Sequence, residues 1–251
     1  MTDLERRQAL DAIAAEVKVC TNCRLHETRT QAVPGEGDPG TEVVFVGEGP
    51  GRDEDAQGRP FVGESGRLLT RLIGSIGWGR DEVYITNVVK CRPPGNRDPQ
   101  PDEIAACAGY LQRQLEVLDP ALIVTLGRFS LGTFRPGDRI GTVHGTTRPA
   151  ASREDALAFA MYHPAYAVRD KNNEPTLFAD MTGVPGALME ARRRREAGDQ
   201  SATVPAAAVD QAAAAAADQG PGNARPLEAP PIEPTLDPPP PDDPVPQLTL
   251  F

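Results

Sequence analysis

Apolar and polar positions along the chain follow two alternating patterns. Helical spacing predicts helices over residues 4–18, 65–77 and 101–118. The apolar face of the first helix consists of Leu4, Leu10, Ile13 and Val17. Short apolar runs rich in β-branched residues predict strands over residues 42–47, 82–89, 121–127 and 156–162. Apolar strands alternating with helices indicate an α/β domain, in which a parallel sheet is covered on both faces.

Polar or glycine-rich segments fall where three of the predicted strands end. The turn GEGPG (47–51) follows the first strand, Asn87 lies near the end of the second, and His163 follows the fourth. In a parallel sheet, ligands bind beyond the carboxyl ends of the strands. The sequence therefore predicts that these three elements converge on one rim of the sheet.

The composition changes near residue 197. Beyond it lie a six-alanine run at 212–217 and 12 of the 26 prolines, and no aromatic residue occurs before Phe251. Such a segment buries too little apolar surface to offset its conformational entropy. We therefore expect a folded domain over residues 1–196, followed by a disordered, acidic, Pro/Ala-rich tail over residues 197–246.

The net charge of −10 is concentrated in this tail. Nine acidic residues and one basic residue follow Arg195, so residues 1–195 carry 27 acidic against 25 basic side chains. A nearly neutral domain can still bind nucleic acid through a local basic face. The first residues hold no apolar segment, and no apolar run approaches the ~18 residues of a membrane span. We expect a cytoplasmic protein without membrane association.

The four cysteines have the spacing of a metal site. Cys20 and Cys23 form a CxxC pair, and Cys91 and Cys107 follow at a distance. A CxxC brings two thiolates to one centre, and two distant thiolates complete a site of four sulfurs. Such a site suits zinc or a [4Fe–4S] cluster, and the spacing leaves both open. The plainer interpretation is two unrelated buried cysteines beside a chance CxxC.

Three long motifs resemble one known family. The segments GEGPGRDEDAQGRPFVGESGRLL (47–69), VYITNVVKCRPPGNRDPQPDE (83–103) and YHPAYAVR (162–169) resemble the family 4 uracil-DNA glycosylases, and the resemblance covers about residues 5–195. It implies a three-layer α/β/α sandwich around a central, mainly parallel four-stranded sheet. It also implies that Cys20, Cys23, Cys91 and Cys107 hold a [4Fe–4S] cluster.

The resemblance implies a monofunctional DNA repair enzyme. It would flip uracil out of DNA and hydrolyse the N-glycosidic bond, leaving an abasic site at the start of base excision repair. A related branch bonds covalently to DNA through a histidine in an inserted basic loop. This chain has no such insert and no histidine between His26 and His144. We expect a monomer associated with the nucleoid and with uracil-containing DNA, single- or double-stranded.

Two other classes of function compete with this one. A non-catalytic iron–sulfur protein that binds uracil-containing or damaged DNA could share the metal site. A nucleotide hydrolase could place a glycine-rich loop after a strand. However, GEGPG lacks the Lys-Ser/Thr pair of a phosphate-binding loop, which argues against the hydrolase.

The motifs supply candidates for a uracil pocket. Phe61 would stack on the flipped base, and Asn87 would pair with uracil O4 and N3–H. A neutral His163 would donate an N–H to O2 as negative charge develops there. Glu48 and Gly49 would offer backbone amides, while the carboxylate of Glu48 or Glu54 would orient water or favour the cationic sugar. Glu54 could instead exclude the methyl group of thymine. The structural alternatives are a core phenylalanine, a capping asparagine, a buried histidine and a solvated acidic turn.

Further candidates would contact DNA outside the pocket. In the wider superfamily a loop follows the histidine that His163 matches, and Tyr166 or Val168 in that loop would wedge into the vacated base position, with Arg169 on a phosphate. Additional phosphate contacts would come from three cations that could equally be ordinary surface charges: Lys90, Arg92 and Arg97.

The last five residues resemble the QLxLF peptides by which bacterial proteins dock on the replication sliding clamp. Leu250 and Phe251 would fill an apolar pocket, and Gln247 with the backbone around Leu248 would make polar contacts. The preceding tail of roughly 50 residues would span on the order of 40 Å on average. The sequence thus predicts a tethered clamp-binding peptide at 247–251, unless the match is a coincidence.

Overall fold

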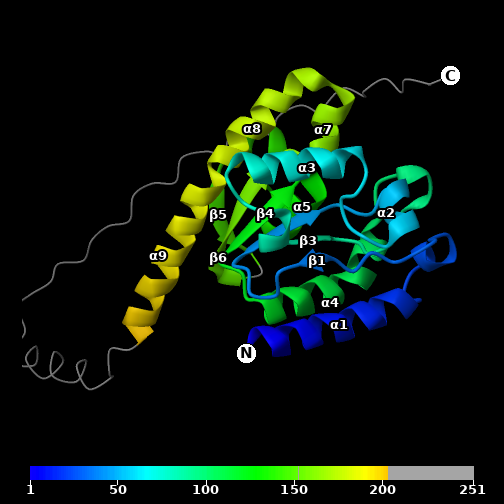
Figure 1. Ribbon diagram of the computed structural model, residues 1–251, viewed down its shortest axis with the longest axis horizontal. Helices are drawn as coiled ribbons and strands as arrows, with labels where there is room; N and C mark the ends of the chain where they lie inside the picture. Colours follow the sequence, from blue (N-terminus) through cyan, green and yellow to red (C-terminus); the bar gives the residue numbers. More distant parts are fainter. Residues whose placement is uncertain (152, 203–251) are drawn as a thin grey trace, which may run out of the picture. The chain divides into compact units, whose positions relative to one another are not determined.

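A mixed sheet of six strands lies between two layers of helices (Figure 1). The computed structural model describes residues 1–151 and 153–202. In this part of the chain the strand order is β1-β3-β2-β4-β6-β5. The four inner strands are parallel to one another: β2 (Val43–Gly47), β3 (Tyr84–Asn87), β4 (Leu122–Leu126) and β6 (Arg153–Met161).

The four parallel strands are those that the apolar runs predict. Two short antiparallel strands, β1 (Glu36–Gly37) and β5 (Thr147–Ala150), extend the sheet at its edges. Neither edge strand is an apolar run, since β1 has two residues and β5 contains Arg148 and Pro149. The sheet is therefore wider than predicted and mixed at its edges.

The helices cover both faces of the sheet. α1 (Asp3–Val19) and α4 (Pro101–Leu118) lie along one face, and α3 (Glu64–Ser75), α8 (Glu174–Thr182) and α9 (Val184–Ala202) cover the other (Figure 1). The remaining helices are short: α2 (Arg52–Gln57), α5 (Arg128–Phe134), α6 (Ile140–Val143) and α7 (Pro164–Arg169). Single 3-10 turns are η1 (Arg24–Glu27), η2 (Arg80–Glu82), η3 (Pro94–Asn96) and η4 (Lys171–Asn173).

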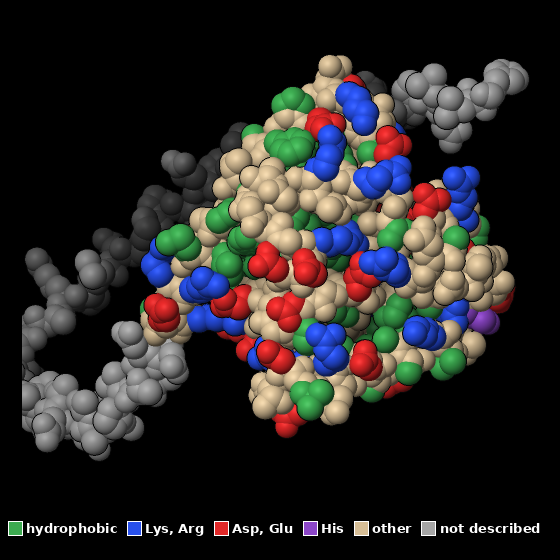
Figure 2. All heavy atoms as spheres, in the orientation of Figure 1, with side chains coloured by type: hydrophobic (Ala, Val, Ile, Leu, Met, Phe, Trp, Pro, Cys, Tyr) green, Lys and Arg blue, Asp and Glu red, His purple; other side chains and the backbone are tan. Residues whose placement is uncertain are grey.

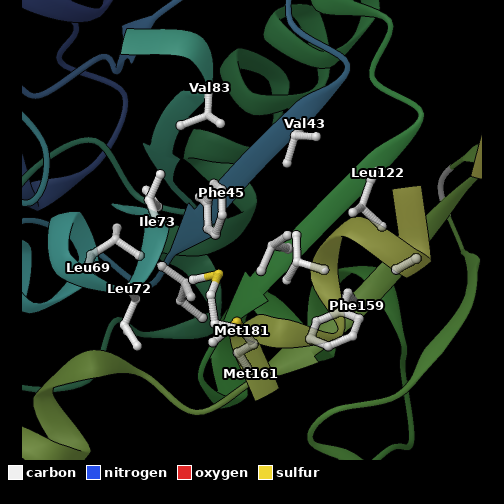
Figure 3. Packing of buried hydrophobic residues seen from close by; sticks show 14 of the residues in the cluster. Val43, Phe45, Leu69, Leu72, Ile73, Val83, Leu122, Phe159, Met161 and Met181 are labelled. Atoms are coloured by element: carbon white, nitrogen blue, oxygen red, sulfur yellow. The ribbon is translucent and has the colours of Figure 1, made fainter. Parts of the chain in front are cut away.

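Successive side chains of β2 point to opposite faces of the sheet, so this one strand contributes to both apolar layers. Val43 and Phe45 pack with Leu69, Leu72 and Ile73 of α3 (Figure 3). Val44 and Val46 face the opposite way and belong to the layer formed with α1 and α4. Successive strand side chains point to opposite faces, so a strand buried on both sides must be apolar throughout. The predicted three-layer α/β/α sandwich is confirmed.

The predicted domain boundary falls within the last described helix. Helix α9 continues to Ala202, and the rest of the predicted tail, with the peptide 247–251, lies outside the described residues. In the part of the chain that the structure covers, no helix combines the length and apolarity needed to cross a membrane. Figure 2 shows acidic and basic side chains interspersed on the face that it presents, in keeping with a nearly neutral domain.

Candidate active site

A cavity of about 590 Å³ opens at the carboxyl ends of the parallel strands. The turn after β2, Asn87 at the end of β3 and His163 after β6 all line it, so the predicted convergence is confirmed. The segment after β4 also contributes, through Gly127 and Arg128, which are not among the residues predicted from the sequence. The carboxyl end of each inner strand, or the segment directly after it, thus supplies at least one residue to the same cavity.

Phe61 forms an aromatic wall of this cavity in a strained backbone conformation. Its φ is 50°, a value rarely adopted by a bulky residue, and its side chain is buried. Two glycines make room for it. A Cβ on Gly47 would lie 2.6 Å from Phe61 Cζ, and a Cβ on Gly66 would lie 1.9 Å from the Phe61 carbonyl oxygen. The position of the ring therefore depends on residues of β2 and α3.

Replacing Gly66 with alanine should destabilise the protein by about 1–3 kcal/mol, because the backbone of Phe61 must move to accept the new methyl group. Gly74→Ala is the matched control, since a Cβ at Gly74 in the same helix meets no atom within 4 Å. The control should be neutral or slightly stabilising. Urea unfolding of both variants measures the difference. Equal stability of the two variants would contradict the packing described for Phe61.

Asn87 presents a buried, unsatisfied acceptor. It is 1% exposed, lines the cavity, and pairs with Gly47 in the register between β2 and β3. Its side-chain Oδ1 has no hydrogen-bond partner among the described residues. A buried acceptor without a partner costs about 1–3 kcal/mol. This arrangement suits a ligand that brings an N–H into the cavity.

His163 is a neutral donor by virtue of its surroundings. It precedes α7, where its Nδ1 accepts a hydrogen bond of 3.1 Å from the backbone N–H of Ala165. Since Nδ1 accepts, the proton of the neutral ring lies on Nε2. Burial, and secondarily the positive charge of Arg169, lowers the pKa of His163 to about 4. Its ring centroid lies 5.6 Å from that of Phe61, so both rings border the same space.

Glu48 has the pKa of a group that can change protonation near neutrality. Burial raises the pKa of its carboxyl to about 7, and the negative charge of Asp98 adds to this rise. The positive charges of Arg128 and Arg169 act in the opposite direction. A carboxylate with a pKa near the working pH is suited to general base catalysis.

Glu54, the other candidate carboxylate, is occupied by backbone amides. Its Oε1 accepts from the N–H groups of Val62 and Gly63, at 2.9 Å each, and its Oε2 accepts from Gly51 at 3.1 Å. Glu54 therefore fastens the turn after β2 to the segment that carries Phe61. Among the two candidates, Glu48 has the carboxylate that is available for a ligand.

The segment after His163 is the short helix α7, where the sequence analysis expected a loop. Tyr166 is 37% exposed and lines the cavity, as does Arg169. Val168 is partly buried and packs against the apolar core. Of the two candidate wedge residues, Tyr166 is thus the one at the mouth of the cavity.

An aromatic stack supports Tyr166. Its ring lies 4.8 Å from that of Tyr162 at an interplanar angle of 23°, and the ring of Tyr162 lies 4.7 Å from that of His144. His144 Nδ1 lies 2.9 Å from Oδ1 of the buried Asp180. The stack joins residues from α6–β5, β6, α7 and α8, and no single sequence motif contains it.

Basic residues at the cavity differ in what they contact. Arg128 pairs with Asp98 and stacks over the ring of Phe129, with 4.5 Å from its Cζ to the ring centroid. Arg97 lines the cavity but donates to Glu103 at 2.7 and 2.8 Å, and Arg92 donates to Asn96 at 2.7 Å. Arg128 follows Gly127 directly after a predicted strand. This position at a strand end is the sequence signal from which Arg128 could have been predicted as a site residue.

Lys90 does not reach the surface. It is 1% exposed, and its ammonium is hydrogen bonded within the protein. The prediction that it contacts a DNA phosphate is therefore wrong.

The four cysteines surround a second, small cavity. Cys20 follows α1, Cys23 precedes η1, Cys91 follows β3 and Cys107 lies on α4. None of them forms a disulfide. Cys91 Sγ accepts from Arg29 Nη1 at 3.1 Å, and Cys107 Sγ accepts from the backbone N–H of Lys90 at 3.3 Å. Hydrogen bonds to cysteine sulfurs are among the features that set the reduction potential of iron–sulfur clusters.

The cysteines encircle this space without converging on one point. Within the described residues, no three side chains of His, Cys, Asp or Glu are arranged to hold a single metal ion.

The fold and the cavity together define a class of protein. It is an α/β/α domain whose cavity combines an aromatic wall, an amide and a neutral histidine, a set of groups suited to a planar polar ligand. Residues 34–182 match the family model described as the uracil DNA glycosylase superfamily. The chain belongs to this superfamily, within its type-4 branch.

Several curated proteins are similar to this chain. A type-4 uracil-DNA glycosylase of Sulfurisphaera tokodaii is 48% identical over 179 residues, which cover 68% of this chain and 81% of the relative. A type-4 uracil-DNA glycosylase of Thermotoga maritima is 44% identical over 169 residues, covering 67% and 88%. A type-5 uracil-DNA glycosylase of Thermus thermophilus is 35% identical over 114 residues, covering 39% and 52%.

Proposed function

We propose that this protein is a monofunctional DNA glycosylase that excises uracil from DNA and leaves an abasic site. The observation that carries the proposal is the meeting of Phe61, Asn87 and His163 in one cavity at the strand ends. The names of the similar proteins support the same substrate.

The chemistry follows from the polarity of each side chain. A flipped uracil stacks against Phe61, its N3–H donates to the unpaired Oδ1 of Asn87, and the amide of Asn87 donates to O4. The bond from the sugar to N1 breaks with its electron pair remaining on the base. Negative charge that reaches O2 is stabilised by Nε2–H of the neutral His163. Water adds to the sugar carbon and gives up a proton, which the Glu48 carboxylate can hold.

Residues at the mouth would contact the DNA. Tyr166, on its aromatic stack, would fill the position of the extruded base, and Arg128 and Arg169 would contact phosphates. Among the described residues that line the cavity there is no lysine. A Schiff base with the abasic sugar therefore lacks its amine, which supports hydrolysis without strand cleavage.

Oligonucleotides with one uracil, both single- and double-stranded, test this function. The protein should release free uracil and leave an abasic strand that breaks only after treatment with hot alkali. Matched oligonucleotides with thymine or cytosine at the same position should remain intact. Tight binding to the uracil strand without any release would instead support the non-catalytic DNA binder.

We further propose that Cys20, Cys23, Cys91 and Cys107 hold a [4Fe–4S] cluster. All four cysteines line one cavity, thiolates are the ligands of such clusters, and two of the sulfurs accept N–H hydrogen bonds. When bound, the cluster would tie α1 and η1 to α4 and to the segment after β3. Its role would be structural.

Protein purified without oxygen should be brown and contain about four irons per chain, the content of one such cluster. Cys107→Ser should lower both the iron content and the thermal stability. Metal analysis and visible absorbance measure these quantities. A colourless protein with one zinc per chain would contradict the cluster.

The C-terminal peptide supports a second interaction, with the bacterial sliding clamp. We propose that Gln247, Leu248, Leu250 and Phe251 bind the clamp while the preceding segment acts as a tether, raising the local concentration of the enzyme on DNA. Deleting residues 247–251 should abolish clamp binding in calorimetry and leave excision from a short oligonucleotide unchanged. A variant with these five residues in scrambled order is the matched control. Unchanged clamp binding by this variant would show that the clamp does not recognise the sequence of the peptide.

A further inference from the structure

The buried Lys90 lies between the two sites described above. It is 1% exposed and follows β3 by three residues, on the segment between Asn87 and Cys91. Its Nζ donates to Thr86 Oγ1 at 2.6 Å, to the carbonyl oxygen of Asn87 at 2.8 Å and to Gln114 Oε1 at 2.7 Å. All three donors of the ammonium are therefore satisfied by acceptors inside the protein.

The acceptors belong to a polar network within an apolar layer. Gln114, on α4, donates from Nε2 to the carbonyl oxygen of Pro34 at 2.8 Å and to the hydroxyl of Tyr84 at 3.3 Å. Thr86 also donates to the carbonyl oxygen of Pro34, at 2.8 Å. Thr86, Gln114 and Tyr84 are themselves buried. The network thus fixes Lys90 in one position between the sheet and α4.

The network supplies hydrogen bonds but no negative charge, because every acceptor of Lys90 is neutral. A buried charge is costly unless an opposite charge lies near it. The groups beside Lys90 that can carry negative charge are the cysteine sulfurs. Cys91 is the next residue, Cys107 Sγ accepts from the backbone N–H of Lys90 at 3.3 Å, and Lys90 borders the cysteine cavity.

The other contact of Lys90 reaches the uracil pocket. Its ammonium holds the backbone carbonyl of Asn87, whose side chain lines the pocket. The segment from Val88 to Lys90 is also fixed through its backbone. Val88 N–H donates to Gly47 O at 3.0 Å and Val89 N–H to Glu48 O at 3.1 Å, while the carbonyl oxygen of Lys90 accepts from Val33 at 2.8 Å. Lys90 therefore connects Asn87, through its side chain, with the cysteine site, through its backbone N–H.

We propose that Lys90 is a positioning residue that couples the two sites. Its ammonium balances the negative charge of a cluster held by the four cysteines, and it fixes the Asn87 carbonyl so that the Asn87 amide faces uracil. The positioning of Asn87 rests on the proposed function, and the charge balance rests on the proposed cluster. It assigns a role to a residue that touches neither DNA nor metal.

Two substitutions separate the charge from the hydrogen bond. Lys90→Met removes both, whereas Lys90→Gln removes the charge and keeps an N–H donor near the Asn87 carbonyl. Lys18→Met is the matched control, because Lys18 is exposed and lies two residues before Cys20. Thr86→Val removes one acceptor and retains the charge, so it reports the effect of merely perturbing the network.

Three measurements are made on protein purified without oxygen: the reduction potential of the cluster, the inhibition constant of free uracil and kcat/KM for excision. Both Lys90 variants should have a more negative potential than the wild type, since a nearby positive charge favours the reduced cluster. In Lys90→Met, displacement of Asn87 should raise the inhibition constant of uracil and lower kcat/KM about 10- to 100-fold. Lys90→Gln should retain more of the uracil binding, and Lys18→Met should match the wild type.

A wild-type potential in both Lys90 variants would overturn the charge-balancing role. An unchanged uracil inhibition constant in Lys90→Met, or a change no larger than in Thr86→Val, would overturn the positioning of Asn87. If Lys90→Met cannot be purified, the reduction potential of Lys90→Gln decides the charge balance, and Lys90→Ala, which also lacks the N–H donor, replaces Lys90→Met in the uracil measurements. Failure of the wild type to release uracil would instead refute the proposed function, and the potentials would still test the charge balance.

Discussion

Replacing His163 with alanine should lower kcat/KM for uracil excision about 10²–10³-fold, the usual effect of removing one donor from an oxyanion-type site. The structure gives the reason. Nδ1 is occupied by the N–H of Ala165, so the only ring proton available to the base is on Nε2. Single-turnover excision measures the loss. His163→Gln should recover part of the rate, because its amide can still donate.

The pH dependence adds a second check on His163. Burial and Arg169 hold the pKa of His163 at about 4, so the ring is neutral throughout the neutral range. Titration of His163 should therefore cause no rise or fall of kcat/KM, that is, no limb in the pH profile, between pH 6 and 8. A wild-type excision rate in His163→Ala would show that His163 has no role in the chemistry.

The second large effect concerns Glu48. If its carboxylate holds the proton lost by water, Glu48→Gln should lower the excision rate about 10²–10⁴-fold. Because burial and Asp98 raise its pKa to about 7, the active, deprotonated form is lost as the pH falls through 7. The wild-type kcat/KM should thus rise with pH up to about 7 and then level off. The profile of Glu48→Gln should lack this limb.

Asp98→Asn is the control for this assignment. Removing the negative charge of Asp98 should lower the pKa of Glu48 and move the limb to lower pH without abolishing activity. A limb that persists in Glu48→Gln would assign the titration to another group. A limb that does not move in Asp98→Asn would show that burial alone raises the pKa.

The sequence predicted the inner sheet because the inner strands, apart from the first three residues of β6, are buried on both faces and therefore form apolar runs in the sequence. The edge strands escaped prediction for the opposite reason. Residues 36–37 and 147–150 pair through backbone groups alone, and their side chains include charged residues and a proline. The segment after His163 was expected to be a loop, yet Pro164 occupies the first turn of α7, where a missing N–H costs nothing.

Within the candidate site, residues inside long motifs were found and residues brought in by the fold were not. Arg128 reaches the cavity from the end of β4, and His144 and Asp180 support the ring of Tyr162 from elements far apart in the chain. Lys90 was misplaced because a lysine beside a cysteine gives no sign of burial. Its neutral partner Gln114 comes from a helix 24 residues further on.

The two edge strands also bear on how folded molecules meet one another. An exposed strand edge is a template on which a second sheet can add, and proteins blunt such edges with short strands, charges and prolines. Here β1 offers only two residues, while β5 has Pro149, which lacks an N–H, and Arg148, which is paired with Asp138. Intermolecular sheet extension therefore finds no regular ladder at either margin of the sheet that the described residues form.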